Sequence, residues 1–177
     1  HILCSGLRPK TWASSQNAVI SAKPNQTRLL FIMKHQIIAA GKPALAYAKT
    51  GVAEYLKRLS RYGSYELKHI KDGSSEDVSE RLSVASKDTL RIVLDERGEK
   101  LTTAALTSCI QRWEMRGVKR ASYLIGASDG HTESMREQAD MIWALSPLTL
   151  QHELALVVLL EQLYRVATIQ RGEPYHR

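Results

Sequence analysis

Cysteine is scarce in this chain, and its scarcity excludes two classes of small protein. Cys4 and Cys109, the only cysteines among 177 residues, are too few and too far apart for a disulfide framework or a zinc site. We therefore expect a reduced, cytoplasmic setting and no bound metal. No apolar run reaches the roughly 18 residues that a membrane span requires, so we also expect no membrane partner.

Several well-known catalytic and phosphate-binding motifs are also missing. The chain has neither the glycine-rich dinucleotide fingerprint nor a Walker phosphate loop, which argues against a generic α/β nucleotide-binding protein. No Ser/His/Asp or Cys/His arrangement stands out, so the sequence offers no candidate for nucleophilic hydrolysis.

Positive charge predominates, but mostly in the first 32 residues. The formal net charge is +7, and residues 1–32 contain four bases and no acid, which leaves +3 for residues 33–177. That excess is too small to predict nucleic-acid binding from bulk charge. A local cluster of bases around one expected helix end either complements the helix dipole or contacts phosphate. Its members are Arg112, Arg116, Lys119 and Arg120.

Residues 1–32 differ from the rest of the chain. They are rich in Ser, Asn, Lys and Pro and show neither helical nor strand periodicity, whereas a regular apolar pattern begins at Met33. We interpret Met33 as the true start and expect residues 1–32 to be a disordered or mis-assigned extension. A functional basic arm is the alternative. Residues 33–177 are long enough for one domain with a core of its own.

From Met33 onward, expected strands and helices alternate. Alternating or continuous apolar runs predict strands at residues 37–40, 65–70, 90–94, 121–125 and 141–144. Apolar residues at helical spacing predict helices at residues 47–60, 76–87, 102–116, 132–141 and 153–169. This alternation predicts an α/β fold with a mainly parallel sheet flanked by helices.

Parallel sheets bind ligands outside the carboxyl ends of their strands, so the loops at those ends are the candidate site. Three loops qualify: a turn at residues 95–98 after Leu94, the glycine-bounded turn Gly126–Gly130, and the segment Leu145–Leu150. The last has few side-chain donors, so it would hold a ligand through backbone groups and apolar walls. An adenine or a thioether suits such a loop better than a triphosphate does. Composition alone favours a tight turn for the Gly126–Gly130 segment and a rigid linker in the core for the Leu145–Leu150 segment.

Two titratable residues near these loops are candidates for proton transfer. His152 follows the Leu145–Leu150 loop, and Asp95 follows a strand. A lone histidine is more often a helix-start residue than a catalyst, and adjacent acids are more often a solvated turn. Trp113 and Trp143 fall in apolar patterns and are interpreted as core residues.

Six short motifs, in order, carry a resemblance to a known family. Residues 33–177 resemble the small bacterial methyltransferases of the SPOUT superfamily that modify N3 of a pseudouridine in large-subunit (23S) ribosomal RNA. The motifs are Gly51-x-x-Glu54-Tyr55-Leu56-Lys57-Arg58, Val93-Leu94-Asp95-Glu96-Arg97-Gly98, Leu124-Ile125-Gly126, Leu145-Ser146-x-Leu148-Thr149-Leu150-x-His152, Glu161-Gln162-Leu163-Tyr164-Arg165 and Pro174-Tyr175-His176-Arg177.

The resemblance implies a fold, a cofactor and an assembly. It implies a C-terminal deep trefoil knot that holds bent S-adenosylmethionine, and a homodimer with the final helix at its interface. Carried over by position, the cofactor contacts are Leu94, Gly126, Leu145, Ser146, Pro147, Leu148, Thr149 and Leu150. The apolar residues offered for the dimer interface are Leu154, Val157, Val158, Leu160 and Leu163.

The resemblance also implies an RNA substrate and assigns roles. Ribosomal RNA would meet the cofactor at the dimer seam, near Arg165, Tyr175, His176 and Arg177. Because the N3 imide proton of pseudouridine must leave, a general base is expected, with His152 as the first choice and Asp95 as the second. Tyr175 or His176 would stack on the base, and Arg165 would pair with a phosphate or with the cofactor carboxylate. Packing across the dimer is an equal alternative for Arg165.

The chain departs from the family pattern at two loops. Ala127 stands where many members have glycine, and its Cβ is expected to weaken cofactor binding. Gln151 and Glu153 replace two prolines around His152, which is expected to loosen the loop and to put an acid near the RNA. These departures leave two alternatives open: a SPOUT-type methyltransferase that acts on another RNA such as transfer RNA, and a non-catalytic ribosome-binding dimer.

Overall fold

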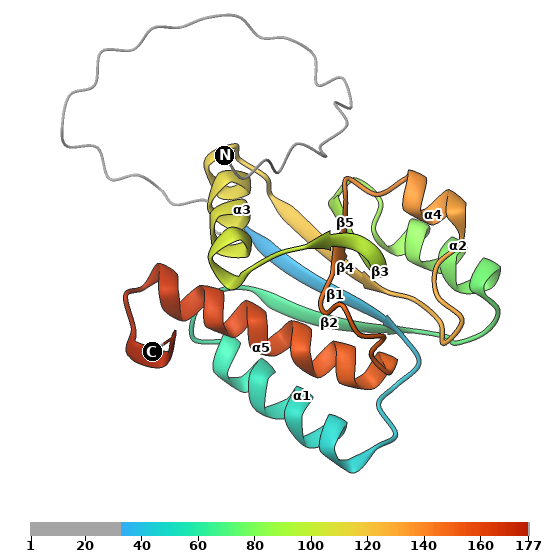
Figure 1. Cartoon of the computed structure of the whole chain (residues 1–177), viewed down its shortest axis with the longest axis horizontal. Helices are drawn as coiled ribbons and strands as arrows, with labels where there is room; N and C mark the ends of the chain where they lie inside the picture. Colours follow the sequence, from blue (N-terminus) through green and yellow to red (C-terminus); the bar gives the residue numbers. More distant parts are fainter. Residues whose placement is uncertain (1–32, 177) are drawn as a thin grey trace, which may run out of the picture.

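The computed structural model describes residues 33–176, and strands and helices alternate along them (Figure 1). Our expectations for residues 1–32 and for Arg177 lie outside the described residues. The elements are β1 (Lys34–Ala40), α1 (Ala46–Leu59), β2 (Tyr65–Ile70), α2 (Ser75–Ala85), β3 (Leu90–Lys100), α3 (Thr103–Met115), β4 (Arg120–Ile125), α4 (Glu133–Glu137), β5 (Met141–Ala144), α5 (His152–Gln170) and the short 3₁₀ helix η1 (Pro174–His176).

The five strands form one parallel sheet in the order β2-β1-β4-β3-β5. Helices α1, α3 and α5 pack on one face of the sheet, and α2 and α4 pack on the other (Figure 1). The predicted α/β class, with a parallel sheet flanked by helices, is confirmed. The trefoil knot stays a prediction.

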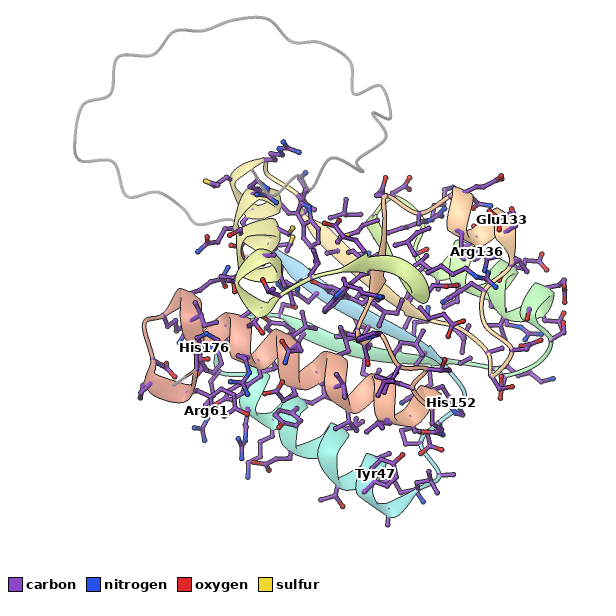
Figure 2. The ribbon with its side chains drawn as sticks, viewed as in Figure 1. Tyr47, Arg61, Glu133, Arg136, His152 and His176 are labelled. Atoms are coloured by element: carbon purple, nitrogen blue, oxygen red, sulfur yellow. The ribbon has the colours of Figure 1, made fainter. Side chains whose placement is uncertain are left out.

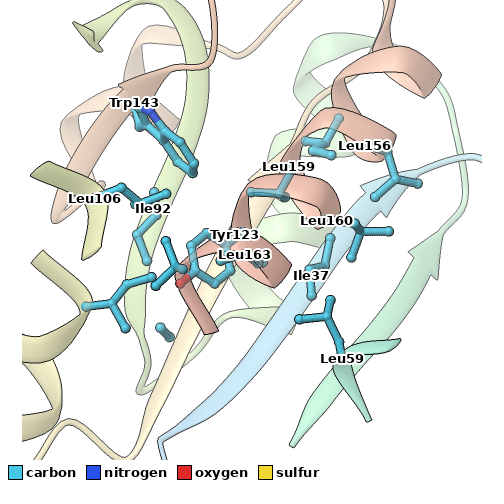
Figure 3. Close-up of a cluster of buried hydrophobic side chains, with 14 of the residues drawn as sticks. Ile37, Leu59, Ile92, Leu106, Tyr123, Trp143, Leu156, Leu159, Leu160 and Leu163 are labelled. Carbon is cyan, nitrogen blue, oxygen red and sulfur yellow. The ribbon is translucent and has the colours of Figure 1, made fainter. Parts of the chain in front are cut away.

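Alternation along the strands feeds two apolar cores. On β1, Ile37 faces the larger core under α1, α3 and α5, whereas the next residue, Ile38, faces the smaller core under α2 and α4. The larger core contains fully buried side chains from α5, including Leu159 and Leu163, packed against Tyr123 of β4 (Figure 3). Burying each such leucine stabilises the fold by about 1.5–3 kcal/mol, so one face of α5 is committed to this chain's own core.

Local hydrogen bonds define where the helices begin. The hydroxyl groups of Ser74, Thr102 and Thr132 accept backbone N–H groups three residues on, at the starts of α2, α3 and α4. At α5, the side chain of Gln151 accepts the N–H of Leu154. These caps place the helix starts within a residue or two of the positions predicted from periodicity.

The predicted turn at residues 95–98 was wrong in part, because strand β3 continues to Lys100. Trp143 of β5 lies opposite Leu94 and again opposite Glu99, so the four residues between them form a bulge rather than a strand end. Gly98 crosses the β5 backbone so closely that an added Cβ would lie 2.6 Å from the carbonyl carbon of Ile142. Periodicity cannot reveal such a crossing, since both partners are backbone.

Helix α4 is shorter than the predicted 132–141. The chain leaves the helix at Gln138, and the Asp140 N–H then donates to the Arg91 carbonyl (2.9 Å) as the start of pairing with β3. The Asp140 carboxylate in turn accepts the Arg91 N–H at 2.8 Å. Sheet pairing therefore ends this helix before its apolar pattern does. Within residues 33–176, none of the helices combines the length and apolarity that crossing a membrane requires.

Candidate active site

A cavity of about 560 Å³ lies at the carboxyl ends of the three neighbouring strands β4, β3 and β5. It is lined by the three loops that leave these strands and by the first turn of α5. Seven of the eight residues expected to contact the cofactor line it: Leu94, Gly126, Leu145, Ser146, Leu148, Thr149 and Leu150. Pro147 belongs to the same loop but does not line the cavity.

Short hydrogen bonds fix the Leu145–Leu150 loop on two sides. The Ser146 hydroxyl accepts the N–H of Leu148 at 2.9 Å, which closes a local turn. The Thr149 hydroxyl donates to the Glu96 carboxylate at 2.6 Å, which joins this loop to the β3 bulge across the cavity mouth. Because these two hydroxyls are engaged locally, the loop offers a ligand mainly backbone groups and apolar surface.

The Gly126–Gly130 loop makes a tight turn over a buried histidine. A Cβ at Gly126 would lie 3.0 Å from the His131 ring, so glycine lets the backbone approach that ring closely. Gly130 has φ +92°, a conformation that favours glycine, and its N–H donates to the Ala127 carbonyl at 3.0 Å. Ala127 lines the cavity, and its side chain is 8% exposed and packs in the smaller core. Its methyl group therefore fills protein interior.

Asp95 and Arg136 form a buried ion pair beside the cavity. Arg136 Nη1 lies 3.3 Å from Asp95 Oδ2, and the two side chains are 13% and 7% exposed. The other oxygen of Asp95 accepts the Arg97 N–H at 3.0 Å, and Arg136 also binds Glu133 and the His131 carbonyl (Figure 2). Both carboxylate oxygens of Asp95 are thus engaged in holding the bulge and the α4 loop together.

Two side chains in the cavity wall carry buried nitrogens without a hydrogen-bond partner. They are both ring nitrogens of His131 and the indole nitrogen of Trp143, and no other buried side-chain N or O atom in residues 33–176 lacks a partner. Burial lowers the pKa of His131, although Asp95 and the backbone of Leu94 and Leu124, which lies near the ring without forming a well-aligned hydrogen bond, act in the opposite direction. An unsatisfied buried donor costs about 1–3 kcal/mol of stability, so the cavity wall is a locally destabilising part of the fold.

His152 is the first residue of α5 and lines the cavity (Figure 2). The helix start brings it beside the Leu145–Leu150 loop, with its side chain half-buried. Of the two candidate bases, His152 is therefore the one that is not held in an ion pair within the described residues, whereas Asp95 is.

The two residues that replace prolines around His152 both make hydrogen bonds to the α1 segment, while the expected loosening of the loop and the expected acid near the RNA stay predictions. Glu153 is 7% exposed and turns toward α1, where its carboxylate accepts the N–H groups of Ala44 and Leu45, both at 3.0 Å. Gln151 caps α5 and also accepts the Tyr47 hydroxyl at 3.2 Å. Hydrogen bonds to α1 thus hold this loop in place of the two prolines.

The expected RNA-binding residues of the C-terminus lie at the opposite end of α5 (Figure 2). Arg165 is 13 residues beyond His152, which is about 20 Å along a helix. Its guanidinium binds Glu161 (Nε to Oε1, 3.0 Å) and lies 4.7 Å from the centre of the Tyr175 ring. Tyr175 also contacts Tyr164 edge-on at 4.7 Å and donates to Glu161 at 3.2 Å. His176 is exposed. One chain therefore does not bring these residues to His152.

The apolar residues offered for a dimer interface need correction. Leu160 and Leu163 are fully buried in the chain's own core, and Val157 packs against Gly51, where a Cβ would be 3.0 Å away. Leu154 is exposed. Helical periodicity shows that a face is apolar but does not tell a core-facing stripe from an interface stripe.

Sequence reasoning missed His131, Arg136 and Trp143 as parts of this site. Arg136 and His131 come from the α4 segment and meet Asp95 only after β3 and β4 pair, so no local spacing indicates them. Trp143 was interpreted as core, which its 3% exposure supports, but it also lines the cavity.

The cavity fits the group that the resemblance implies. Its volume lies within the range of about 300–1,000 Å³ that is typical of small-molecule sites, and the Leu145–Leu150 loop gives part of its wall an apolar surface. The absence of a side chain at Gly126 leaves its backbone open to the cavity, which suits the close approach of an adenosyl ligand. A parallel sheet with such a cavity beyond β4, β3 and β5 defines an α/β protein that binds a small ligand at the carboxyl ends of its strands.

Comparison with known proteins places the chain in a family. The family described as "Predicted SPOUT methyltransferase" matches residues 33–176, so the chain belongs to this family. The chain is 46% identical over 145 residues to ribosomal RNA large subunit methyltransferase H of Thermus thermophilus, covering 82% of this chain and 99% of that protein. It is 40% identical to the protein of the same name from Deinococcus radiodurans, with the same coverage. A crystal structure of a tRNA (m1G37) methyltransferase from Aquifex aeolicus overlaps 76% of this chain and 70% of its own, with a TM-score of 0.47 and 14% identity.

Proposed function

We propose that the protein transfers a methyl group from S-adenosylmethionine to N3 of a pseudouridine in 23S ribosomal RNA, in the cytoplasm. The observation that supports this most directly is the cavity itself. It joins a backbone-rich loop, a glycine-bounded turn and His152 at the carboxyl ends of adjacent parallel strands. The large-subunit methyltransferases named above cover the same residues, which favours the ribosomal substrate over another RNA.

Cofactor binding is proposed to rest on Leu94, Gly126 and the Leu145–Leu150 loop. When bound, S-adenosylmethionine supplies a methyl group already activated by its sulfonium. The chain must therefore mainly hold and orient the reactants, which is where much of a catalysed rate originates. The Thr149–Glu96 hydrogen bond ties the loop to the β3 bulge, and the Asp95–Arg136 ion pair ties the bulge to α4. Together these two interactions hold the loops around the cavity in fixed positions relative to one another.

Proton removal is proposed to fall to His152. The N3 proton of pseudouridine must leave as the nitrogen attacks, and a histidine near neutral pKa is the usual acceptor for such a proton. Asp95 is the weaker choice because Arg136 and the Arg97 N–H already occupy its oxygens. We assign Asp95 the role of holding the bulge.

The substrate site is proposed to be completed by a second copy of the chain. His152 and Arg165 are about 20 Å apart along α5, so one chain does not unite the base with the expected RNA contacts. Exposed apolar side chains surround the His152 end and offer a surface for the partner's C-terminal residues. They are Leu45, Tyr47, Leu148 and Leu154, which are 44%, 49%, 73% and 37% exposed.

The test of function is transfer of labelled methyl from S-adenosylmethionine to ribosomes that lack the modification, followed by identification of the nucleoside. Label in N3-methylpseudouridine of large-subunit RNA is the expected result. Label in transfer RNA would support the other-RNA alternative. Ribosome binding without cofactor binding would support a non-catalytic dimer.

Mixed dimers test the shared site. Chains carrying His152→Ala or Arg165→Ala are each expected to be inactive. If Arg165 acts across the interface, mixing the two restores activity, because one of the two hybrid sites then contains neither change. If Arg165 acts within its own chain, every hybrid site carries a change and mixing restores nothing.

A further inference from the structure

A cluster of five cations lies around the amino ends of strands β1 and β4, whereas the cavity lies at the carboxyl ends of the strands. Lys34 begins β1 and Arg120 begins β4, and the two residues are directly paired in the sheet. The Lys34 N–H donates to the Lys119 carbonyl at 3.0 Å, and the chain reaches Lys119 from the end of α3 (Figure 1). We call this cluster the basic edge, and it consists of Lys34, Arg112, Arg116, Lys119 and Arg120.

The charges of the basic edge are not neutralised within the described chain. Within residues 33–176, four arginines pair with carboxylates, namely Arg58, Arg81, Arg136 and Arg165, whereas none of the five cations of the basic edge does so. Four of the five are exposed, and the half-buried Arg112 donates to the Cys109 sulfur at 3.1 Å.

Neither Glu114 nor Asp88 balances this charge. Glu114, on the same turn as Arg112, is half-buried and accepts from Gln170 of α5 at 3.2 Å, so its carboxylate is directed to a neighbour on the helix side. Lys87 and Asp88, in the turn before β3, add one charge of each sign. The five cations and Glu114 together give a local charge of +4.

Helix electrostatics explains only part of the cluster. Arg112 is in the last turn of α3 and Arg116 follows it, where a cation stabilises the helix C-terminus. Lys34, Lys119 and Arg120 precede or begin strands and gain nothing from a helix dipole. Like charges gathered at one place repel one another, so they favour an anionic partner.

The residues that line the cavity do not attract an anionic partner in this way. Three acids and two arginines line the cavity, a net charge of −1 with histidine neutral: Asp95, Glu96, Asp129, Arg97 and Arg136. Affinity for RNA comes largely from cations that meet phosphates. The side of the molecule that would carry out the chemistry is therefore poorly equipped to attract a polyanion over distance.

We propose that the basic edge binds the phosphate backbone of the RNA substrate at a distance from the methylated nucleotide, a proposal that rests on the RNA methyltransferase function above. Strand β4 has six residues, so its two ends are about 20 Å apart. That distance spans several nucleotides, so the basic edge touches RNA remote from the target. A large folded RNA presents such phosphates, and a short oligonucleotide around the target does not.

The test compares two double charge reversals in the full chain. Arg116→Glu with Lys119→Glu alters the basic edge at two exposed positions, and because Arg116 is the C-cap of α3 the change also costs some helix stability. Lys49→Glu with Lys57→Glu makes the same change of charge on exposed positions of α1 and is the matched control. Thermal melting confirms that each variant is folded, and binding to ribosomes is measured over a range of salt concentrations.

The basic-edge variant is expected to bind ribosomes at least about 10-fold more weakly. The slope of the logarithm of its binding constant against the logarithm of salt concentration should become shallower by about 1–2, as the loss of two phosphate contacts implies. Protein-free 23S RNA should show the same loss, while affinity for S-adenosylmethionine stays unchanged. An equal loss in the control, unchanged salt dependence, or a loss on ribosomes but not on free RNA would overturn the proposal. Wild-type chain that binds RNA but transfers no methyl would contradict the proposed function alone.

Discussion

The two ends of α5 are built in opposite ways, although one continuous helix joins them. At the His152 end, the helix borders a cavity whose wall contains the unpaired nitrogens of His131 and Trp143. At the Arg165 end, the polar side chains pair with one another: Arg165 and Tyr175 with Glu161, and Tyr62 with Glu173. The first end therefore borders a cavity, whereas hydrogen bonds at the second end hold the C-terminal residues against the helix.

The contrast also changes how the C-terminal aromatic residues are understood. Tyr164 contacts Tyr55, Tyr62 and Tyr175, so four rings from α1, the turn after it, α5 and η1 meet in one cluster. Burial raises the pKa of Tyr175 well above its ordinary range, so the hydroxyl keeps its proton and donates to Glu161. A ring engaged on its edge by Tyr164 and on its face by Arg165 is first of all an anchor of residues 174–176. The exposed His176 is then the better candidate for direct contact with RNA.

The largest expected effect comes from His152→Ala at the cavity end. We expect kcat for methyl transfer to fall by about 10²–10⁴, the usual worth of a general base. Affinity for S-adenosylmethionine should change little, because backbone groups of neighbouring loops are expected to hold it. Methyl transfer across the neutral pH range, together with calorimetric binding, checks both. His69→Ala, which alters a histidine bound to the Gly41 carbonyl, is the control. Full turnover by the His152 variant at every pH would show that another group accepts the proton.

Gly98→Ala tests the backbone crossing under the same cavity. The new Cβ would lie 2.6–2.7 Å from backbone atoms of Ile142 and Trp143, so one strand must move. We expect a loss of about 3 kcal/mol, the upper part of the usual range for overpacking, or about 6–12 °C in Tm. In the control Gly73→Ala, the new Cβ meets only side-chain atoms of Asp77 and Arg81. Equal melting of the two variants would mean that β5 yields to the added methyl without cost.

Tyr175→Ala tests the anchored end of α5. Loss of the ring removes an aromatic contact and a cation–π contact, each worth about 0.5–1.5 kcal/mol, so residues 174–176 should detach. Tyr175→Phe keeps both ring contacts and loses only the bond to Glu161, so it should remain attached. Hydrogen exchange of the C-terminal residues without RNA measures the difference. Unchanged exchange in the alanine variant would mean that Tyr175 does not anchor residues 174–176, and stacking on the RNA base would again be the role to test.

The sequence predicts the cavity end better than it predicts the anchored end. Loops that follow parallel strands converge because parallel topology requires it, so Leu94, Gly126 and the Leu145–Leu150 segment could be grouped in advance. The contacts of Glu153 and Tyr175 depend on how α1 packs beside α5, which periodicity does not specify. The same limit applies to Leu160, since an apolar helix face gives no sign of whether its neighbour is the chain's own sheet or a second copy.

The β3 bulge shows a second limit. Asp95 through Gly98 have the composition of a turn, yet the strand resumes and pairs with β5 again. A β-propensity scale scores side chains, whereas this crossing depends on the one side chain that is missing at Gly98. The Asp95–Arg136 pair that stabilises the bulge joins residues 41 positions apart and forms only in the folded sheet.

The smallest expected effect, Glu153→Gln, asks whether the cavity end is also partly anchored. The N–H groups of Leu45 and Ala44 lower the pKa of Glu153, because they stabilise its charged carboxylate in the folded state. A lowered folded pKa contributes stability that is present above the unfolded value, near 4.3, and is lost as the pH falls through the folded value. The wild-type chain should therefore lose Tm between neutral pH and pH values below that range more steeply than the variant, which has no charge to lose. Glu80→Gln, at an exposed position of α2, controls for the loss of one carboxylate. If Glu153→Gln and Glu80→Gln gave the same pH profile, the tether to α1 would add nothing, and the order of the loop around His152 would have to come from the Gln151 cap alone.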